Sequence, residues 1–254
     1  MSLQQYATAA AVGVASYYLA KYLDKKKTTG KIVVGYWGIR GLGAPLRMMC
    51  AYSGADHEVV SYSAPEPWFG KKKPELLKKN PLANLPYLEM PDGTVVCESN
   101  ACFAHLADHL GLVPTSAAAK VRDAELLNLC MCTRNDMTNR CYDKAKCPDR
   151  AAFDASMATL FEGSIFGKYE ATLVASGTPF FCGDSPCACD FHIFEMMDQF
   201  TKLGADLKLS PPLAKLPLCA AFHERFKALP SLAAYFASDI YKAPVNAPNM
   251  ANWS

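Results

Sequence analysis

The sequence predicts a small α/β domain followed by an all-helical domain. Short strand-like apolar runs occur between residues 32 and 98, whereas from about residue 120 the apolar residues recur at helical spacing. The stretch GLVPTSAAA (111–119) separates the two patterns. We therefore expect an α/β domain at 31–112 and a helical domain at 119–254, preceded by a separate segment at 1–30.

The first domain opens with a strand–helix–strand pattern. IVVGY (32–36) is predicted to be a short buried strand, and HEVVSY (57–62) alternates like a second strand. Between them, Pro45 suits the first turn of a helix that runs to about Ser53, and Gly54 suits its end.

The same domain closes with a hairpin and a helix. A polar, lysine-rich connection leads to LPYLEM (85–90) and TVVCE (94–98), which flank a PDG turn. Proline presets one turn dihedral and glycine accepts a positive one, so the two runs are predicted to pair. Ser99 is expected to cap a helix that extends to about His109.

The second domain shows no convincing strand. Its apolar residues recur at the spacing of amphipathic helices, and the chain contains no internal repeat. The helical pattern covers the stretches 120–133, 151–175, 188–203, 213–228 and 230–238.

Composition narrows the classes of function. A net charge of +2 over 254 residues gives no basis for nucleic-acid binding. The eleven cysteines are odd in number and scattered, which favours free thiols in a reducing compartment. Cys182, Cys187, Cys189 and His192 form the tightest group, but their spacing matches no common structural zinc site. We therefore expect packed thiols there and no metal.

The first thirty residues differ from the rest of the chain. Residues 3–20 carry no charge, and Lys21 and a DKKK cluster follow them. The segment 3–23 therefore suits a membrane anchor or a partner-helix contact, with the bulk of the chain facing the cytosol. The mitochondrial outer membrane is one such destination. The alternative is a surface helix or tail on a cytoplasmic protein.

The stretch VVGYWGIRGLG (33–43) ends a buried strand on Tyr36, beside a glycine-rich turn. A neutral phenol donates a hydrogen bond, and one that reaches a thiol sulfur favours the thiolate. A half-buried structural tyrosine is the simpler interpretation of Tyr36 alone. The glycines follow the order G-x-x-G-x-G, so they do not form the dinucleotide-binding fingerprint G-x-G-x-x-G.

Two further motifs suit a peptide-like ligand. Leu85-Pro86 precedes a strand, and a cis proline there can leave the Leu85 backbone open to an extended peptide. In ESNA (98–101), the amides at the helix start suit a carboxylate and Glu98 suits an ammonium. A strand-entry proline and an ordinary capped helix are the structural alternatives.

These features together describe one ligand. Lys72 and Trp68, in the preceding loop, add a cation and an aromatic ring. The ligand would have an amino-acid end, a peptide backbone, a thiol and a further carboxylate. That combination is the chemistry of glutathione.

Longer motifs agree with this ligand. The stretches YWGIRGLGAPLR, NLPYL, ESNA, FFCGDSPCACDF and MANWS resemble motifs of the glutathione S-transferase family, and of its mu class in particular. The resemblance covers about residues 32–253.

The resemblance implies a thioredoxin-like domain followed by a helical glutathione-transferase domain, usually as a homodimer, with glutathione as co-substrate and no metal. Tyr36 would stabilise the glutathione thiolate, and Tyr142, in RCYDK, would assist on the electrophile side. The tripeptide would be held by Trp37, Leu42, Trp68, Lys72, Asn84, Leu85, Pro86, Glu98 and Ser99.

One departure from the mu pattern concerns the dimer. Cys132 stands where the class would supply an aspartate across the dimer to the glutathione amino group. Asp136, one helical turn later, is the candidate replacement.

Two functions stay open. The first is a detoxifying, mu-like transferase that conjugates the glutathione thiolate to small electrophiles. The second is a non-catalytic transferase fold that serves as a structural subunit of a membrane protein complex. A thiol-disulfide oxidoreductase is disfavoured, because Tyr36, Trp37 and Gly38 stand where a nucleophilic cysteine is needed. The sequence favours the enzyme, and no motif specifies the electrophile.

Overall fold

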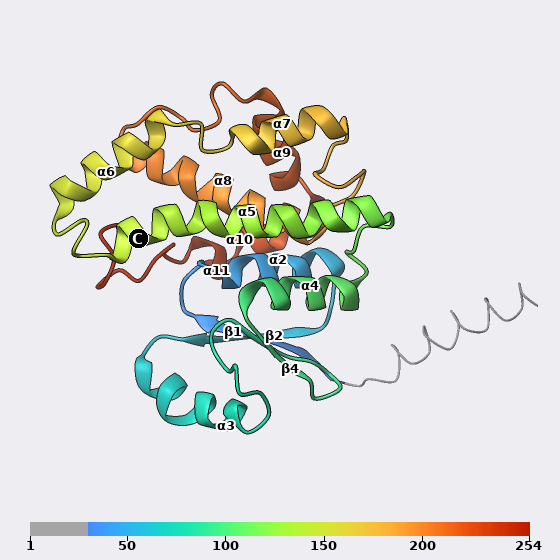
Figure 1. Ribbon diagram of the computed structural model, residues 1–254. Coiled ribbons are helices and arrows are strands. Elements are labelled where there is room, and N and C mark those ends of the chain that lie inside the picture. The colour runs from blue at the N-terminus through green and yellow to red at the C-terminus, as the bar shows by residue number, and fades with distance from the viewer. Residues whose placement is uncertain (1–29) are drawn as a thin grey trace, which may run out of the picture.

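A computed structural model describes residues 30–254 of the chain (Figure 1). The predicted membrane or partner-helix segment 3–23 lies outside the described residues. From residue 30 onward, no helix is both long enough and apolar enough to cross a bilayer.

The first domain is built on a mixed, four-stranded sheet with the order β2-β1-β3-β4. Its strands are β1 (Ile32–Trp37), β2 (His57–Tyr62), β3 (Tyr87–Glu89) and β4 (Val95–Cys97). β1 runs parallel to β2, and β3 is antiparallel to both β1 and β4. The predicted strands and hairpin are confirmed, although β3 and β4 are shorter than the apolar runs that predicted them.

Helices cover both faces of this sheet (Figure 1). On the side of the second domain lie α2 (Gly43–Ser53) and α4 (Ser99–Leu110), and α2 ends at Gly54 in the left-handed conformation, as predicted. The other face is covered by a π-helical turn, η1 (Pro67–Lys72), and by α3 (Lys73–Leu77). We expected only a polar connection there, because a short segment with mostly exposed lysines carries little helical periodicity.

The second domain is all-helical, as predicted. It comprises α5 (Ala117–Tyr142), α6 (Arg150–Glu162), α7 (Gly167–Ser176), α8 (Ala188–Asp206), α9 (Pro217–Lys227), η2 (Pro230–Leu232), α10 (Ala233–Ala237) and α11 (Asp239–Lys242). The pattern at 151–175 corresponds to two helices, since α6 ends at Glu162 and α7 begins at Gly167. Almost every residue of α8 from Ala188 to Phe200 is fully buried, so α8 is the core of this domain.

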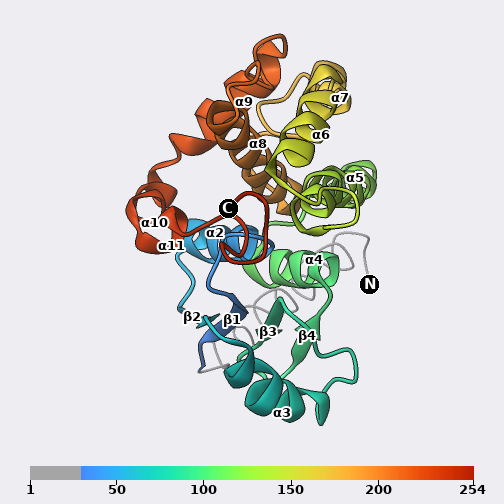
Figure 2. The same ribbon diagram turned by 90° about the vertical axis from the view of Figure 1, so that its left-hand side faces the viewer.

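The two domains pack through α2 and α8. The rings of Tyr52 and Phe191 meet edge to face across this contact, with their centroids 5.5 Å apart. Figure 2 shows α10 and α11 beside α2, and the C-terminal segment returning toward the same helix. The residues that follow β1 are therefore enclosed by both domains.

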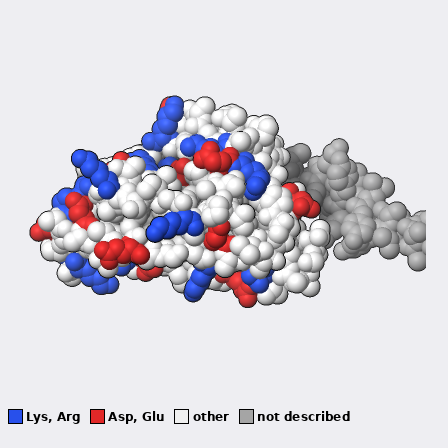
Figure 3. All heavy atoms as spheres, turned by 90° about the horizontal axis from the view of Figure 1, so that it is seen from above, with Lys and Arg blue, Asp and Glu red and all other residues white. Residues whose placement is uncertain are grey.

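The charged side chains are mixed over the face seen from above. Lysines and arginines alternate with aspartates and glutamates there, and neither sign forms a large patch (Figure 3). This distribution agrees with the small net charge of the chain.

Candidate functional site

The register of the sheet gathers three of the predicted motifs at one edge. Gly35 of β1 pairs with Tyr87 of β3, and Tyr87 pairs with Cys97 of β4. Because β3 is antiparallel to both neighbours, the end of β1, the start of β3 and the end of β4 meet at the same edge. The segments 36–43, 84–86 and 98–101 are therefore neighbours in space.

Tyr36 lies at this edge with only 5% of its surface exposed. Two glycines make room for its ring. A Cβ atom on Gly41 would lie 2.7 Å from Tyr36 Cε1 and 2.9 Å from its hydroxyl oxygen, and one on Gly43 would lie 2.8 Å from Tyr36 Cβ. The glycines thus serve to pack the turn directly against the tyrosine.

Two other predicted residues border the same turn. The Trp37 ring is half-buried and meets Tyr62 edge to face, with centroids 6.4 Å apart. Leu42 is half-buried and takes the cap position of α2.

Arg47, which the sequence analysis did not select, holds the turn from inside. Its buried guanidinium donates to the backbone oxygens of Ile39 (2.9 Å) and Trp37 (3.2 Å), and it lies 6.0 Å from the centre of the Tyr36 ring. Burial lowers the pKa of Arg47. The Arg47 guanidinium is therefore a fixed positive charge beside the Tyr36 ring.

The side chain of Arg40 was also missed. It leaves the glycine turn and enters the helical domain, where it pairs with carboxylates of α8, including Asp198 at 2.6 Å. Its backbone N–H donates to Pro244 of the C-terminal segment (2.8 Å). The turn after β1 is thus tied to both the core helix and the C-terminus.

The Leu85–Pro86 peptide bond is cis. This confirms the geometry considered from the sequence. Pro86 is buried, Leu85 is half-buried and Asn84 is exposed. The Leu85 backbone therefore lies directly before β3, at the same edge of the sheet as Tyr36.

Glu98 occupies an unusual backbone conformation at the start of α4. Its φ is 68° and its ψ is 122°, which a residue with a side chain rarely adopts. Strain of this kind is frequent at ligand sites. Glu98 is exposed, so its carboxylate is accessible to a ligand.

The prediction that Ser99 caps α4 is wrong. Ser99 is the first helical residue and Glu98 takes the cap position, and within the described part of the chain the Glu98 side chain makes no capping hydrogen bond. The first backbone N–H groups of α4 are therefore not used by the Glu98 side chain and can donate to another acceptor. A helix start of this type suits a carboxylate ligand.

Trp68 and Lys72 contact protein groups. Only 1% of Trp68 is exposed, and its indole stacks on Tyr87 with centroids 5.8 Å apart. The Lys72 ammonium lies 2.7 Å from Glu89 and 3.0 Å from Glu75. Trp68 thus packs in the core beneath the sheet, and two carboxylates compensate the charge of Lys72.

Tyr142 ends α5 and is half-buried beside the C-terminal segment. Its hydroxyl oxygen accepts a 2.7 Å bond from the Ala247 N–H, which leaves its own hydrogen to donate. Burial raises the pKa of Tyr142, and the nearby Tyr36 raises it further, because two phenolates would repel each other. The two predicted tyrosines therefore lie close enough to interact electrostatically.

Cys132 and Asp136 are exposed on α5. Both line a surface hollow of about 360 Å³ that is bordered by α6, α7 and α8. Asp136 is thus one helical turn from Cys132 on the same face of α5.

Both domains match family models of known proteins. Residues 32–108 match the model of the glutathione S-transferase N-terminal domain, and residues 135–239 match a model of the glutathione S-transferase C-terminal domain. The two matches fall on the two structural domains described above.

Curated relatives and solved structures agree with these matches. The chain is 29% identical over 226 residues to glutathione S-transferase Mu 1 of Oryctolagus cuniculus (84% of this chain and 94% of the relative). It is 27% identical to glutathione S-transferase Mu 1 of Mus musculus over 88% of this chain and 98% of the relative. A crystal structure of the glutathione S-transferase Blo t 8 superposes with a TM-score of 0.68 and 25% identity, covering 87% and 98% of the two chains.

Proposed function

Because this chain belongs to the glutathione S-transferase family, we propose that it conjugates the thiolate of glutathione to small electrophiles at the edge of the sheet that holds Tyr36. The observation that carries the proposal is the pairing register. It gathers the end of β1, the cis Leu85–Pro86 bond and the start of α4 around one space.

Tyr36 is proposed to stabilise the thiolate. A hydrogen bond from its hydroxyl strengthens when the sulfur becomes charged, so it lowers the pKa of the bound thiol. The thiolate is the nucleophile, and bringing it against the electrophile supplies the rest of the rate enhancement. The Arg47 guanidinium, fixed 6.0 Å from the Tyr36 ring, adds a favourable positive charge.

The tripeptide is proposed to lie along the same edge. The Leu85 backbone would pair with its extended chain, with Asn84 and Pro86 shaping this position. The first amides of α4, from Ser99 onward, would bind the γ-glutamyl carboxylate, and Glu98 would accept from the ammonium. Trp37 and Leu42 would border the sulfur end.

Trp68 and Lys72 stay predictions. In the structure their side chains are engaged by Tyr87 and by two carboxylates, so a contact with the ligand would require Lys72 to share its charge with Glu89.

Tyr142 is proposed to act on the electrophile. Tyr142 lies within electrostatic range of Tyr36. Because its hydroxyl oxygen accepts from the Ala247 N–H, its hydroxyl hydrogen can donate to a polar group on the second substrate.

We also propose that the chain is mu-like and forms a homodimer. In that dimer Asp136, in place of the aspartate that is missing at Cys132, would contact the glutathione amino group of the partner subunit. Attachment to a membrane through residues 3–23, and the role of a structural subunit that depends on it, stay predictions.

The full-length protein tests this function with glutathione and chlorodinitrobenzene. Tyr36→Phe should reduce turnover on the order of 100-fold, with little change in glutathione affinity, because it removes a donor to a developing charge. Tyr52→Phe is the matched control, since Tyr52 packs against Phe191 at the domain contact. Turnover that Tyr36→Phe leaves unchanged would refute the role of Tyr36. A folded wild-type protein that neither turns over nor retains glutathione would refute the enzyme.

A further inference from the structure

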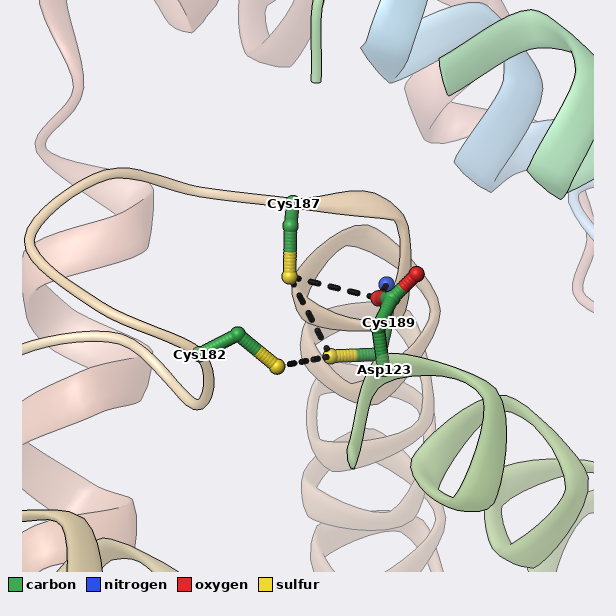
Figure 4. A group of neighbouring side chains, drawn as sticks. All are labelled: Asp123, Cys182, Cys187 and Cys189. Atoms are coloured by element: carbon green, nitrogen blue, oxygen red, sulfur yellow. Dashed lines mark hydrogen bonds between the residues drawn. The ribbon is translucent and has the colours of Figure 1, made fainter. Parts of the chain in front are cut away.

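We propose that Asp123, Cys182, Cys187 and Cys189 form a structural zinc site where α5, the loop before α8 and the first turn of α8 meet (Figure 4). The site is separate from the glutathione chemistry, and the proposal does not depend on it. It also differs from the group that the sequence suggested, because His192 lies against the Phe103 ring instead and Asp123 takes its place.

The spacing of the four donor atoms is that of a tetrahedral metal shell. All four lie within 4.8 Å of one another. The Cys189 sulfur is 3.5 Å from that of Cys187 and 3.9 Å from that of Cys182, and the Cys187 sulfur is 3.2 Å from Asp123 Oδ1. With zinc–sulfur bonds of about 2.3 Å and zinc–oxygen bonds of about 2.1 Å, a tetrahedron separates two sulfurs by about 3.8 Å and sulfur from oxygen by about 3.6 Å.

The donors are held in place by backbone hydrogen bonds. Asp123 Oδ1 accepts from the Cys189 N–H at 2.8 Å, which fixes the carboxylate of α5 above the start of α8. Asp190 Oδ2 accepts from the Cys187 N–H at 2.9 Å, and Asp190 Oδ1 accepts from the Phe181 N–H at 3.0 Å, so this carboxylate fixes the backbone beside Cys187 and Cys182. Contacts of this kind orient the side chains that bind a metal and are a regular part of metal sites.

The chemistry of the donors favours zinc. Thiolates select soft or borderline cations, and three sulfurs with one carboxylate fill the tetrahedral coordination of Zn²⁺. Because no position stays open for a substrate or water, the site would be structural. Binding would replace the three thiol protons, which pass to solvent, and would leave a charge of −2 over the metal and its four ligands. The positive end of the α8 dipole lies next to this charge, and Arg122 lines the same surface hollow as Cys182.

A cation can reach the site from solvent. Cys187 and Cys189 are buried, whereas Cys182 is half-buried. Cys182 also lines a surface hollow of about 330 Å³ together with Arg122 and Phe181. The metal would therefore enter on the Cys182 side and cross-link three segments that are otherwise joined by hydrogen bonds.

Alkylation of the full-length, reduced and chelator-treated protein tests the site directly. Iodoacetamide modification is followed for each cysteine by mass spectrometry, with and without one equivalent of Zn²⁺. We expect Zn²⁺ to slow modification of Cys182 at least tenfold and to leave the exposed Cys132 of the same molecule unchanged. Equal rates at Cys182 with and without Zn²⁺ would overturn the proposal.

Metal content provides the second measurement. After gel filtration under reducing conditions, the wild-type protein and the control Cys132→Ser should each hold about one zinc per chain, and Cys182→Ser should bind at least tenfold more weakly. Co²⁺ in place of zinc should give the intense visible absorption of a tetrahedral thiolate site in the first two proteins. If Cys182→Ser does not fold, Asp123→Asn is used in its place. The amide keeps an oxygen that accepts from the Cys189 N–H but removes the carboxylate charge that binds the metal. Wild-type protein without bound metal, or a ligand variant that binds as the wild type does, contradicts the site.

Discussion

The guanidinium of Arg40, on the turn after β1, lies 3.0 and 2.8 Å from the two carboxylate oxygens of Glu195 in the middle of α8. Both side chains are buried, at 5% and 0% exposure. A bidentate pair of this geometry fixes distance and orientation together. It therefore joins the turn that packs around Tyr36 to the core helix of the other domain.

Removing one partner of this pair should be costly. Arg40→Met leaves the Glu195 charge buried without its cation, so we expect the free energy of unfolding to fall by about 3–5 kcal/mol. Denaturant titration measures the change. Arg150→Met is the control, because Arg150 forms an exposed pair with Asp154 at 2.6 Å, which should contribute less than about 1 kcal/mol. Equal losses in the two variants would show that Arg40 owes its effect to something other than burial.

A methyl group at residue 41 should disturb Tyr36. Gly41→Ala would place a Cβ 2.7 Å from the Tyr36 ring at a φ of +38°, so we expect turnover per folded molecule to drop at least tenfold. Gly93→Ala is matched to it, since Gly93 also has a positive φ (+86°), but apart from its chain neighbours no atom of residues 30–254 lies within 4 Å of the added atom. The control should lose about 1 kcal/mol of stability and keep its turnover. Full activity in Gly41→Ala would mean that Tyr36 need not be held in this position.

Glu98 should lower the stability of the fold while it contributes to glutathione binding. Glu98→Gly relieves the positive φ of 68°, and we expect the free energy of unfolding to rise by about 1 kcal/mol. The same change removes the proposed acceptor for the glutathione ammonium, so KM for glutathione should rise roughly tenfold.

Lys208→Gly separates these two effects. Lys208 is the other described residue with a side chain at positive φ (56°), and it follows α8. This variant should gain similar stability while KM stays constant. A KM that Glu98→Gly does not change would count against a ligand contact at Glu98.

His192 should make the protein sensitive to acid. Its ring is fully buried, neither nitrogen has a hydrogen-bond partner among residues 30–254, and burial lowers its pKa to about 3. The ordinary histidine pKa in the unfolded chain is about 6.5, so below that pH the unfolded state binds more protons. The contribution to stability is therefore complete above pH 6.5 and decreases as the pH falls toward 3.

His192→Leu removes this titration. Between pH 7 and pH 5 the wild-type protein should lose about 2 kcal/mol more stability than the variant, as measured by urea unfolding at each pH. At pH 7 the variant should also be the more stable protein, because the unpaired polar atoms are gone. His105→Leu, at an exposed position, should keep the wild-type acid sensitivity. Parallel pH profiles for wild type and His192→Leu would show that His192 is not neutral in the folded state.

Local features were predictable because they follow from neighbouring residues. The alternation of 57–62 predicts β2, Gly54 predicts the end of α2, and PDG predicts the hairpin. The position of Tyr36 at a strand end followed in the same way, whereas the start of α4 was predicted one residue too late, with Ser99 as its cap. Each depends on backbone geometry within a few residues.

The sequence by itself thus determined the succession of the four strands, the change to an all-helical domain and some element ends, such as Gly54 after α2. Only the tertiary structure decided which ends meet. The bond from Cys187 to Asp123 spans 64 residues and that from Arg40 to Glu195 spans 155, so no local pattern encodes either contact. Such pairs form only when α5 and the sheet dock on α8, because burial and packing of whole elements, rather than the propensities of single segments, set the distances between them.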